Sequence, residues 1–343
     1  MLYYYALLYY NINLKQINTM KKIHLISTLI GLLAFSTISK ADLKVVTSIK
    51  PIHSLASYIM DGVGSPGLIV DGYNSPHSFQ LKPSHAKMLE QADIIFWIGE
   101  DLENFLEKPL DTIAKKAEKI ELLEIKGIKK LKFRERNIFE EHDDHGHDAK
   151  KEEHDDHGHD AKKEEHDDHD DHEGHGHGEY DPHIWLDPIN AKVILNEITE
   201  HLIENDSKNA STYKSNLAKA LAEIDKLIID VITETNTDLS YVVFHDAYQY
   251  YENRFNVNIL GAMTVNPDVM PGAEQIHEIH EVIEHDNVSC ILSEPQFNPD
   301  IIKSIAKDTN VKTGVLDPLG ANLKPGKDLY FDLIRNMSAS FNC

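Results

Sequence analysis

Four residues far apart in the chain carry side chains that bind transition metals: His77, His183, His245 and Asp317. Two of them, His245 and Asp317, stand at the carboxyl ends of predicted strands, and the other two lie in loops. Ligands of open α/β sheets bind just outside the carboxyl ends of the strands. Two such sheets facing each other would therefore bring all four side chains together. Three imidazoles and one carboxylate suit tetrahedral zinc, whereas calcium and magnesium take oxygen ligands.

The chain changes character around His183, which two Asp-Pro pairs bracket within residues 180–188. A low-complexity tract precedes it at 140–178, in which a twelve-residue unit starts at Glu141, repeats at Glu153 and decays from Glu165. The tract has no apolar residue larger than alanine, so it predicts a disordered loop. We expect its histidines to collect zinc weakly; the alternative is a solvated loop that binds metal only because it is rich in histidine. These histidines are His142, His145, His147, His154, His157, His159, His166, His169, His172, His175 and His177.

The net charge of −23 argues against a nucleic-acid partner. Residues 140–179 hold 18 acidic residues and four lysines, so the tract supplies 14 of these negative charges. The rest of the 343-residue chain is ordinary for a soluble protein and long enough for two lobes. We expect a monomer.

The N-terminus predicts export. A positive start at Met20-Lys21-Lys22 leads into an apolar run, and small residues end at Ala41, which is typical of a secretory signal over 20–41 that follows an upstream extension. The alternative is a membrane anchor, but the apolar run is short for a membrane span. No cysteine lies near Ala41 for lipid attachment. We therefore expect a soluble protein in the periplasm.

The two cysteines, Cys290 and Cys343, are expected to form a disulfide in an oxidising compartment. Closing a loop of this length would stabilise the fold by about 4 kcal/mol in the chain-entropy model. The alternative is a pair of free thiols.

Apolar patterning predicts an α/β protein with two lobes, each a mostly parallel sheet flanked by helices. The expected N-terminal lobe spans 42–205 and includes the histidine-rich loop. Its strands are predicted at 43–48, 68–70 and 93–99, and its helices at 51–59, 85–91 (capped by Ser84) and 188–204.

One long rigid helix over 206–236, capped by Asp206, is expected to join the two lobes. About 30 residues at 1.5 Å rise span roughly 45 Å, which is longer than one lobe. The expected C-terminal lobe spans 237–343. It has strands at 241–244, 258–261, 289–293 and 311–316, and helices around 248–251, 273–284 and 299–308.

Several ordered motifs resemble the zinc-specific periplasmic solute-binding proteins of ABC transporters (ZnuA-type). They are Pro-His-Ser-Phe-Gln-Leu-Lys-Pro-Ser at 76–84, Asp-Pro-His-Ile-Trp-Leu-Asp-Pro at 181–188, Phe-His-Asp-Ala-Tyr at 244–248, Glu-Pro-Gln-Phe at 294–297 and Leu-Asp-Pro-Leu-Gly at 316–320. The resemblance covers about residues 42–343. It implies high-affinity capture of Zn²⁺ between the lobes and delivery to a membrane permease that works with a cytoplasmic ATPase.

The family's three histidine ligands fall on His77, His183 and His245. The manganese branch of the superfamily places a carboxylate where His245 stands, so the resemblance favours zinc over a manganese- or iron-binding member. Where some members have a glutamate beside the first histidine, this chain has Pro76. Either Asp317 or a water is then expected as the fourth ligand.

Two other function classes remain open. A hydrolytic zinc enzyme also uses three histidines and a water, but the chain has no His-Glu-x-x-His motif, and Glu294, the one tempting carboxylate, is predicted to be structural. A metal-storage protein would depend on the histidine-rich loop. We expect no enzymatic activity.

Overall fold

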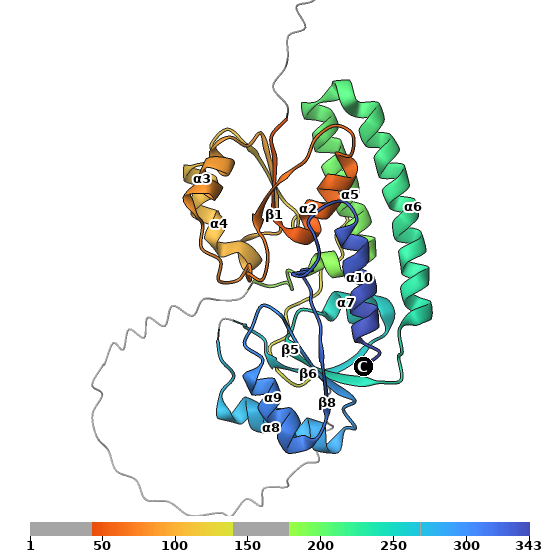
Figure 1. Ribbon diagram of the computed structural model, residues 1–343. Helices are drawn as coiled ribbons and strands as arrows, with labels where there is room; N and C mark the ends of the chain where they lie inside the picture. Colours follow the sequence, from red (N-terminus) through yellow and green to blue (C-terminus); the bar gives the residue numbers. More distant parts are fainter. Residues whose placement is uncertain (1–42, 140–177, 268) are drawn as a thin grey trace, which may run out of the picture. The chain divides into compact units, whose positions relative to one another are not determined.

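The computed structural model describes residues 43–139, 178–267 and 269–343. Two separate four-stranded sheets form the framework of this part of the chain, and both are entirely parallel (Figure 1). The first sheet has the order β2-β1-β3-β4, from β1 (Val45–Ile49), β2 (Gly67–Val70), β3 (Ile94–Trp97) and β4 (Glu118–Glu121). Every residue of β1 and β3 is buried, which is typical of parallel strands covered on both faces.

The second sheet repeats this order as β6-β5-β7-β8. Its strands are β5 (Ser240–His245), β6 (Asn258–Thr264), β7 (Cys290–Ser293) and β8 (Lys312–Val315). In each sheet the chain goes from its first strand to one neighbour and then crosses to the other side, so each has a switch point beside its first strand. The predicted fold class is confirmed: two parallel sheets flanked by helices.

The helices of the first half are α2 (Lys50–Ile59), α3 (Pro83–Glu90), α4 (Glu100–Thr112) and α5 (Pro188–Asn205). Those of the second half are α7 (Gln249–Phe255), α8 (Ala273–His285), α9 (Asp300–Thr309) and α10 (Leu329–Ser340). Short 3₁₀ turns lie at Ile184–Leu186 and Ser207–Asn209.

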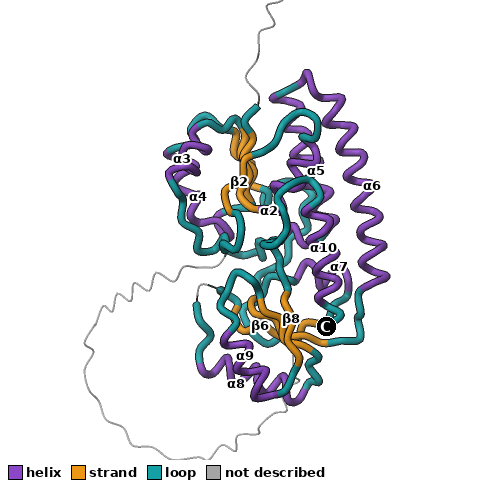
Figure 2. The backbone as a smooth tube through the Cα atoms, in the orientation of Figure 1, coloured by secondary structure: helices purple, strands orange, loops and turns teal. Residues whose placement is uncertain are grey.

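The long helix α6 (Ala210–Glu234) connects the two halves, and α5 and α10 pack against it (Figures 1 and 2). It begins four residues later than predicted, because residues 207–209 form the 3₁₀ turn. Asp206 is not the N-cap of α6, which is Asn209. The carboxylate of Asp206 instead accepts hydrogen bonds from Asn209 Nδ2 at 2.6 Å and from Tyr213 Oη at 2.9 Å. The lobe boundaries at 42–205, 206–236 and 237–343 stay predictions.

Other expectations about the elements need correction. The predicted 85–91 helix starts at Pro83, and Ser84 makes no cap; the Lys82 backbone N–H instead donates to His85 Nδ1 at 3.2 Å. The elements α4, β4 and α10 were not predicted from the sequence. Of these, α4 has apolar residues at helical spacing (Leu102, Leu106 and Leu110) but also contains Pro109.

Cys290 and Cys343 are joined in a disulfide, as predicted. It links the start of β7 to the C-terminal residue, just beyond α10. Within the described residues, no helix is long and apolar enough to cross a membrane. The predicted signal segment and upstream extension (1–41) lie outside the described residues, and so do the eleven histidines between His142 and His177.

Candidate metal centre

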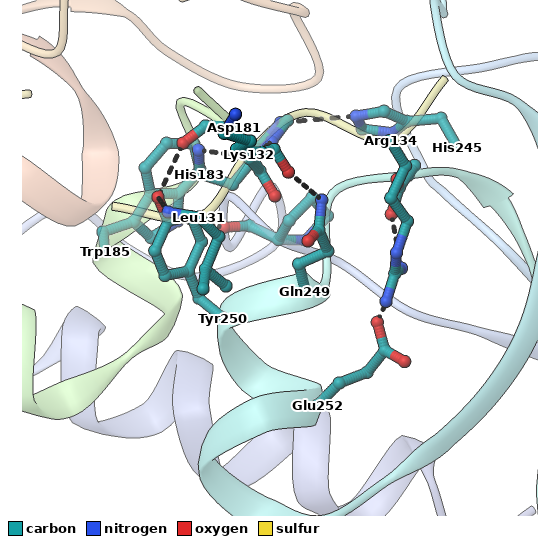
Figure 3. Close-up of polar contacts among 12 residues, drawn as sticks. Leu131, Lys132, Arg134, Asp181, His183, Trp185, His245, Gln249, Tyr250 and Glu252 are labelled. Carbon is teal, nitrogen blue, oxygen red and sulfur yellow. Dashed lines mark hydrogen bonds and ion pairs between the residues drawn. The ribbon is translucent and has the colours of Figure 1, made fainter. Parts of the chain in front are cut away.

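The side chains of His77, His183 and His245 converge between the two sheets. One nitrogen from each of the three rings lies within 4.8 Å of the other two. The Nε2 atoms of His183 and His245 are 3.3 Å apart (Figure 3). Two nitrogens bound to one tetrahedral zinc at 2.0–2.1 Å would be about 3.3 Å apart. The pair is therefore spaced as two ligands of a single ion.

His245 occupies the switch point of the second sheet. It ends β5, and β5 pairs with both β6 and β7. Glu294 follows the end of the adjacent strand β7, and its Oε1 lies 2.7 Å from His245 Nδ1. The carboxylate thus orients the ring and leaves Nε2 as the nitrogen that faces the other histidines.

His183 is positioned by its own local turn. Oδ1 of Asp181 accepts the backbone N–H of His183 at 2.9 Å and lies 2.7 Å from His183 Nδ1. Trp185 packs 5.3 Å from the imidazole, ring centre to ring centre, and its indole N–H donates to Pro318 O at 2.9 Å. The first Asp-Pro pair therefore fixes the imidazole, and the second starts α5, where Asp187 accepts the N–H of Ile189 at 2.8 Å.

His77 comes from the loop between β2 and α3. Its ring centre lies 5.6 Å from that of His183 and 5.5 Å from that of His245. His77 is half-buried, whereas His183 and His245 are each 3% exposed. The more accessible imidazole is thus the one on the loop.

Burial and the paired carboxylates shift the titration of the buried groups. Burial, with a smaller effect of the nearby His245, holds the pKa of His183 well below its ordinary value. Burial also disfavours protonated His245, but the charge and hydrogen bond of Glu294 outweigh it and raise the pKa of His245. Burial raises the pKa of Asp181 to about 7. A neutral His183 is ready to ligate a cation without first losing a proton.

The space among the histidines is small. A cavity of about 10 Å³ is lined by the three rings together with Glu294, Pro318 and Leu319. That is close to the room needed for one water-sized particle. The space among the three rings is therefore of a size that a single ion can occupy.

Asp317 lies beside this cavity, and its carboxylate is engaged by its own loop. Its oxygens accept the backbone N–H groups of Leu319, Gly320 and Ala321 at 2.6–3.1 Å and the amide of Gln296 at 3.0 Å. In the described residues, the group of side chains that could share one ion contains the three histidines but not Asp317. The hydrogen bonds hold the Asp317 carboxylate within its own loop, three of them at Oδ1 and one at Oδ2.

Residues 45–342 of the chain match the model of the ZnuA family, whose description is "Zinc-uptake complex component A periplasmic". The chain belongs to the ZnuA family. It is 48% identical over 301 residues to the high-affinity zinc uptake system protein ZnuA of Brucella abortus strain 2308, an alignment that covers 86% of this chain and 90% of that protein. Identity to the Yersinia pestis protein of the same name is 36% over 322 residues, covering 91% and 94% of the two chains.

Solved structures show the same fold at low sequence identity. A crystal structure of ZnuA superposes with a TM-score of 0.67 at 20% identity and covers 88% of this chain and 100% of that one. A ZnuA deletion mutant lacking 138–173, solved with zinc bound, gives a TM-score of 0.67 at 20% identity and covers 87% and 96%. The ZnuA fold therefore extends over the described residues.

Other histidines of this ZnuA-family chain lie apart from the three-histidine centre. His53 of α2 is buried. His277 of α8 has a side chain that is 75% exposed, and its Nε2 lies 3.5 Å from Glu281 Oε1. A second group of side chains that could hold an ion comprises Glu118, His201 and Glu204. Both ring nitrogens of this histidine already contact carboxylates, Nδ1 that of Glu118 at 2.9 Å and Nε2 that of Glu197 at 3.2 Å.

Proposed function

We propose that this chain captures zinc in the periplasm with high affinity and delivers it to an ABC-type permease. The observation that carries the proposal is the convergence of His77, His183 and His245, with two Nε2 atoms at zinc-ligand spacing. The relatives in Brucella and Yersinia are named as high-affinity zinc uptake proteins, which supports the same assignment. Zinc is the cargo here, so the permease and its cytoplasmic ATPase are the expected partners.

The chemistry of the ligand set favours zinc over manganese and the alkaline-earth ions. Three nitrogens and a confined space suit a four-coordinate borderline-soft ion, whereas magnesium and manganese prefer carboxylate and water ligands. The fourth position we assign to a water, because both oxygens of Asp317 already accept hydrogen bonds within its loop. Asp317 as a direct ligand is the alternative.

A binding protein fits the centre better than a hydrolytic enzyme. The two buried carboxylates paired with the rings are Asp181 and Glu294, and each contacts the Nδ1 of its histidine, so that Nε2 faces the other ring. They are therefore occupied in orienting ligands, which favours a carrier over a hydrolase. The chain acts as a carrier that is exported by its signal segment and works as a monomer. Its histidine-rich insertion adds weak zinc binding outside the main centre.

The test is a calorimetric zinc titration of the exported chain beside a His77→Ala/His183→Ala/His245→Ala variant. We expect the native protein to show one tight site and weaker ones, and the variant to keep only the weak ones. The matched control removes three histidines of α8 instead, His277, His280 and His285, and should keep the tight site. If the tight site survives in the first variant, the insertion binds the zinc and the proposal is wrong.

A further inference from the structure

The segment 131–139, here called the crossing segment, runs past the metal centre from the first half of the fold to the second. Near its start, the carbonyl of Leu131 accepts the N–H of Asp181 at 2.9 Å, and the N–H of Leu131 donates to Tyr250 Oη at 3.0 Å (Figure 3). Tyr250 Oη also donates to the carbonyl of Asp181 at 2.8 Å. The segment is therefore hydrogen-bonded to the turn that carries His183.

The far end of the crossing segment joins the edge of the second sheet. Phe139 N–H donates to Leu260 O, and Ala262 N–H donates to Asn137 O, both at 2.8 Å. Gly261 permits this approach, because a Cβ there would lie 2.6 Å from Asn137 O. With both ends fixed by backbone hydrogen bonds, the side chains between them have a defined place.

Arg134 lies between these two anchored ends and reaches two buried carboxylates (Figure 3). Its Nη1 is 3.0 Å from Asp246 Oδ1 and 2.8 Å from Glu252 Oε2. The side chains of Asp246 and Glu252 are only 2% and 11% exposed. The guanidinium carbon also lies 3.8 Å from the ring centre of Phe139, which covers one face of the cation.

The two carboxylates belong to different elements, and one of them adjoins a candidate ligand. Asp246 directly follows His245 where β5 ends, and Glu252 lies in α7. One planar guanidinium can bind both in a fixed geometry, which a lysine ammonium cannot reproduce. Without the cation, Asp246 would be a buried charge lacking its ion-pair partner, and its turn would be driven towards water. Since Asp246 is bonded to His245, such a movement would displace the imidazole.

We propose that Arg134 is a positioning residue of the zinc centre, which holds Asp246 so that His245 is presented to the ion at its binding distance. This inference rests on the proposed function. A ligand constellation needs to be held within about 0.5 Å, and loss of an outer residue that orients a ligand typically lowers metal affinity ten- to hundredfold. Zinc affinity therefore depends on a residue that does not touch the ion.

The experiment compares Arg134→Met, Arg134→Lys and Arg335→Met with the native chain. Arg335 is the matched control: an arginine of α10 whose Nη2 lies 3.8 Å from Asp230 on α6. Zinc affinity of the tight site is measured by chelator competition, and the visible absorption of bound Co²⁺ reports the ligand geometry. We expect a ten- to hundredfold loss for Arg134→Met with a weakened Co²⁺ spectrum, a smaller loss for Arg134→Lys, and no change for Arg335→Met.

A double-mutant cycle with Asp246→Asn tests the route of the effect. If Arg134 acts through Asp246, then Arg134→Met should cost less affinity in the Asp246→Asn background than in the native one. If the losses of zinc affinity caused by the two substitutions simply add, the inference is wrong. It is also wrong if a folded Arg134→Met variant keeps native zinc affinity and an unchanged Co²⁺ spectrum. Should Arg134→Met fail to fold, the Arg134→Lys variant provides the same comparison. Absence of a tight site in the native chain would instead contradict the proposed function.

Discussion

Glu294 and Asp181 illustrate how differently two residues of one centre are encoded. Asp181 stands two positions before His183, so an aspartate that bonds the following turn could be read from the Asp-Pro-His sequence. Glu294 is 49 residues from His245 and meets it only because β5 and β7 are neighbours in the sheet. That pairing depends on strand order, which sequence patterning leaves open. The role of Glu294 in orienting His245 therefore became apparent only from the fold.

Glu103 offers a residue-scale prediction away from the metal centre. Its carboxyl is fully buried and accepts the backbone N–H groups of Ile98 at 2.8 Å and Gly99 at 3.2 Å. Burial raises its pKa from 4.5 to about 7, against smaller opposing effects of the Ser48 hydroxyl and these N–H groups. Between about pH 4.5 and pH 7 the folded protein keeps this proton and the unfolded chain loses it. The free energy of unfolding contributed by Glu103 therefore falls as the pH rises through this window.

We expect Glu103→Gln to remove this pH dependence, because the amide stays neutral and its oxygen still accepts the two N–H groups. At 1.36 kcal/mol per pKa unit, the native protein should lose at most about 3 kcal/mol relative to the variant between pH 4.5 and pH 7.5. Urea unfolding at both pH values, with zinc chelated, measures the difference. Parallel pH profiles for the two proteins would show that the pKa of Glu103 is the same in the folded and unfolded states.

At the scale of elements, the start of α5 combines a cap with an ion pair. Asp187 caps the helix through the N–H of Ile189, and Arg254 of α7 donates two hydrogen bonds of 2.7 Å to the same carboxylate, which is 2% exposed. The helix that follows the His183 turn is thereby tied to the second half of the fold.

Two substitutions at Asp187 should separate these contributions. Asp187→Asn keeps the capping oxygen and loses the charge, whereas Asp187→Ala loses both. Because loss of a cap typically costs about 1 kcal/mol, we expect Asp187→Ala to be less stable than Asp187→Asn by about that amount, and both to be less stable than the native protein. Thermal unfolding measures the order. Equal stability of the two variants would mean that the cap contributes nothing here.

The sequence predicted the elements with strong periodicity and missed those defined by partners. The apolar strands β3, β5 and β7 and the long α6 were predicted from their patterns, although the start of α6 was displaced by the 3₁₀ turn. The strand β4 is short and has one buried residue, Ile120, so its pairing with β3 is what defines it. The crossing segment forms no helix or strand of its own, and its hydrogen bonds and ion pairs go to backbone groups and carboxylates of distant elements, which sequence patterning does not reveal.

At the scale of the whole molecule, the long helix α6 connects the two halves. The structure adds further connections. The buried Nζ of Lys50, at the start of α2, donates to the carbonyls of Gly320, Ala321 and Leu323 at 2.7–3.0 Å, in the loop that contains Asp317. Tyr330 of α10 donates through its N–H to Ser54 of α2 and through its hydroxyl to the carbonyl of Trp185. With the crossing segment, these contacts tie both halves beside the metal centre.

Zinc binding should therefore change the arrangement of the two halves little. Spin labels at Lys87 in α3 and Lys303 in α9, both exposed lysines, report the distance between the halves. We expect the distance distribution to keep its maximum on zinc addition and to become narrower, because the ion fixes the His77 loop while α6, α10 and the crossing segment already hold the halves. A pair at Lys87 and Lys108, within the first half, is the control for label mobility. A maximum that moves beyond the width of the apo distribution would mean that these connections act as a hinge, and that capture involves closure of the whole molecule.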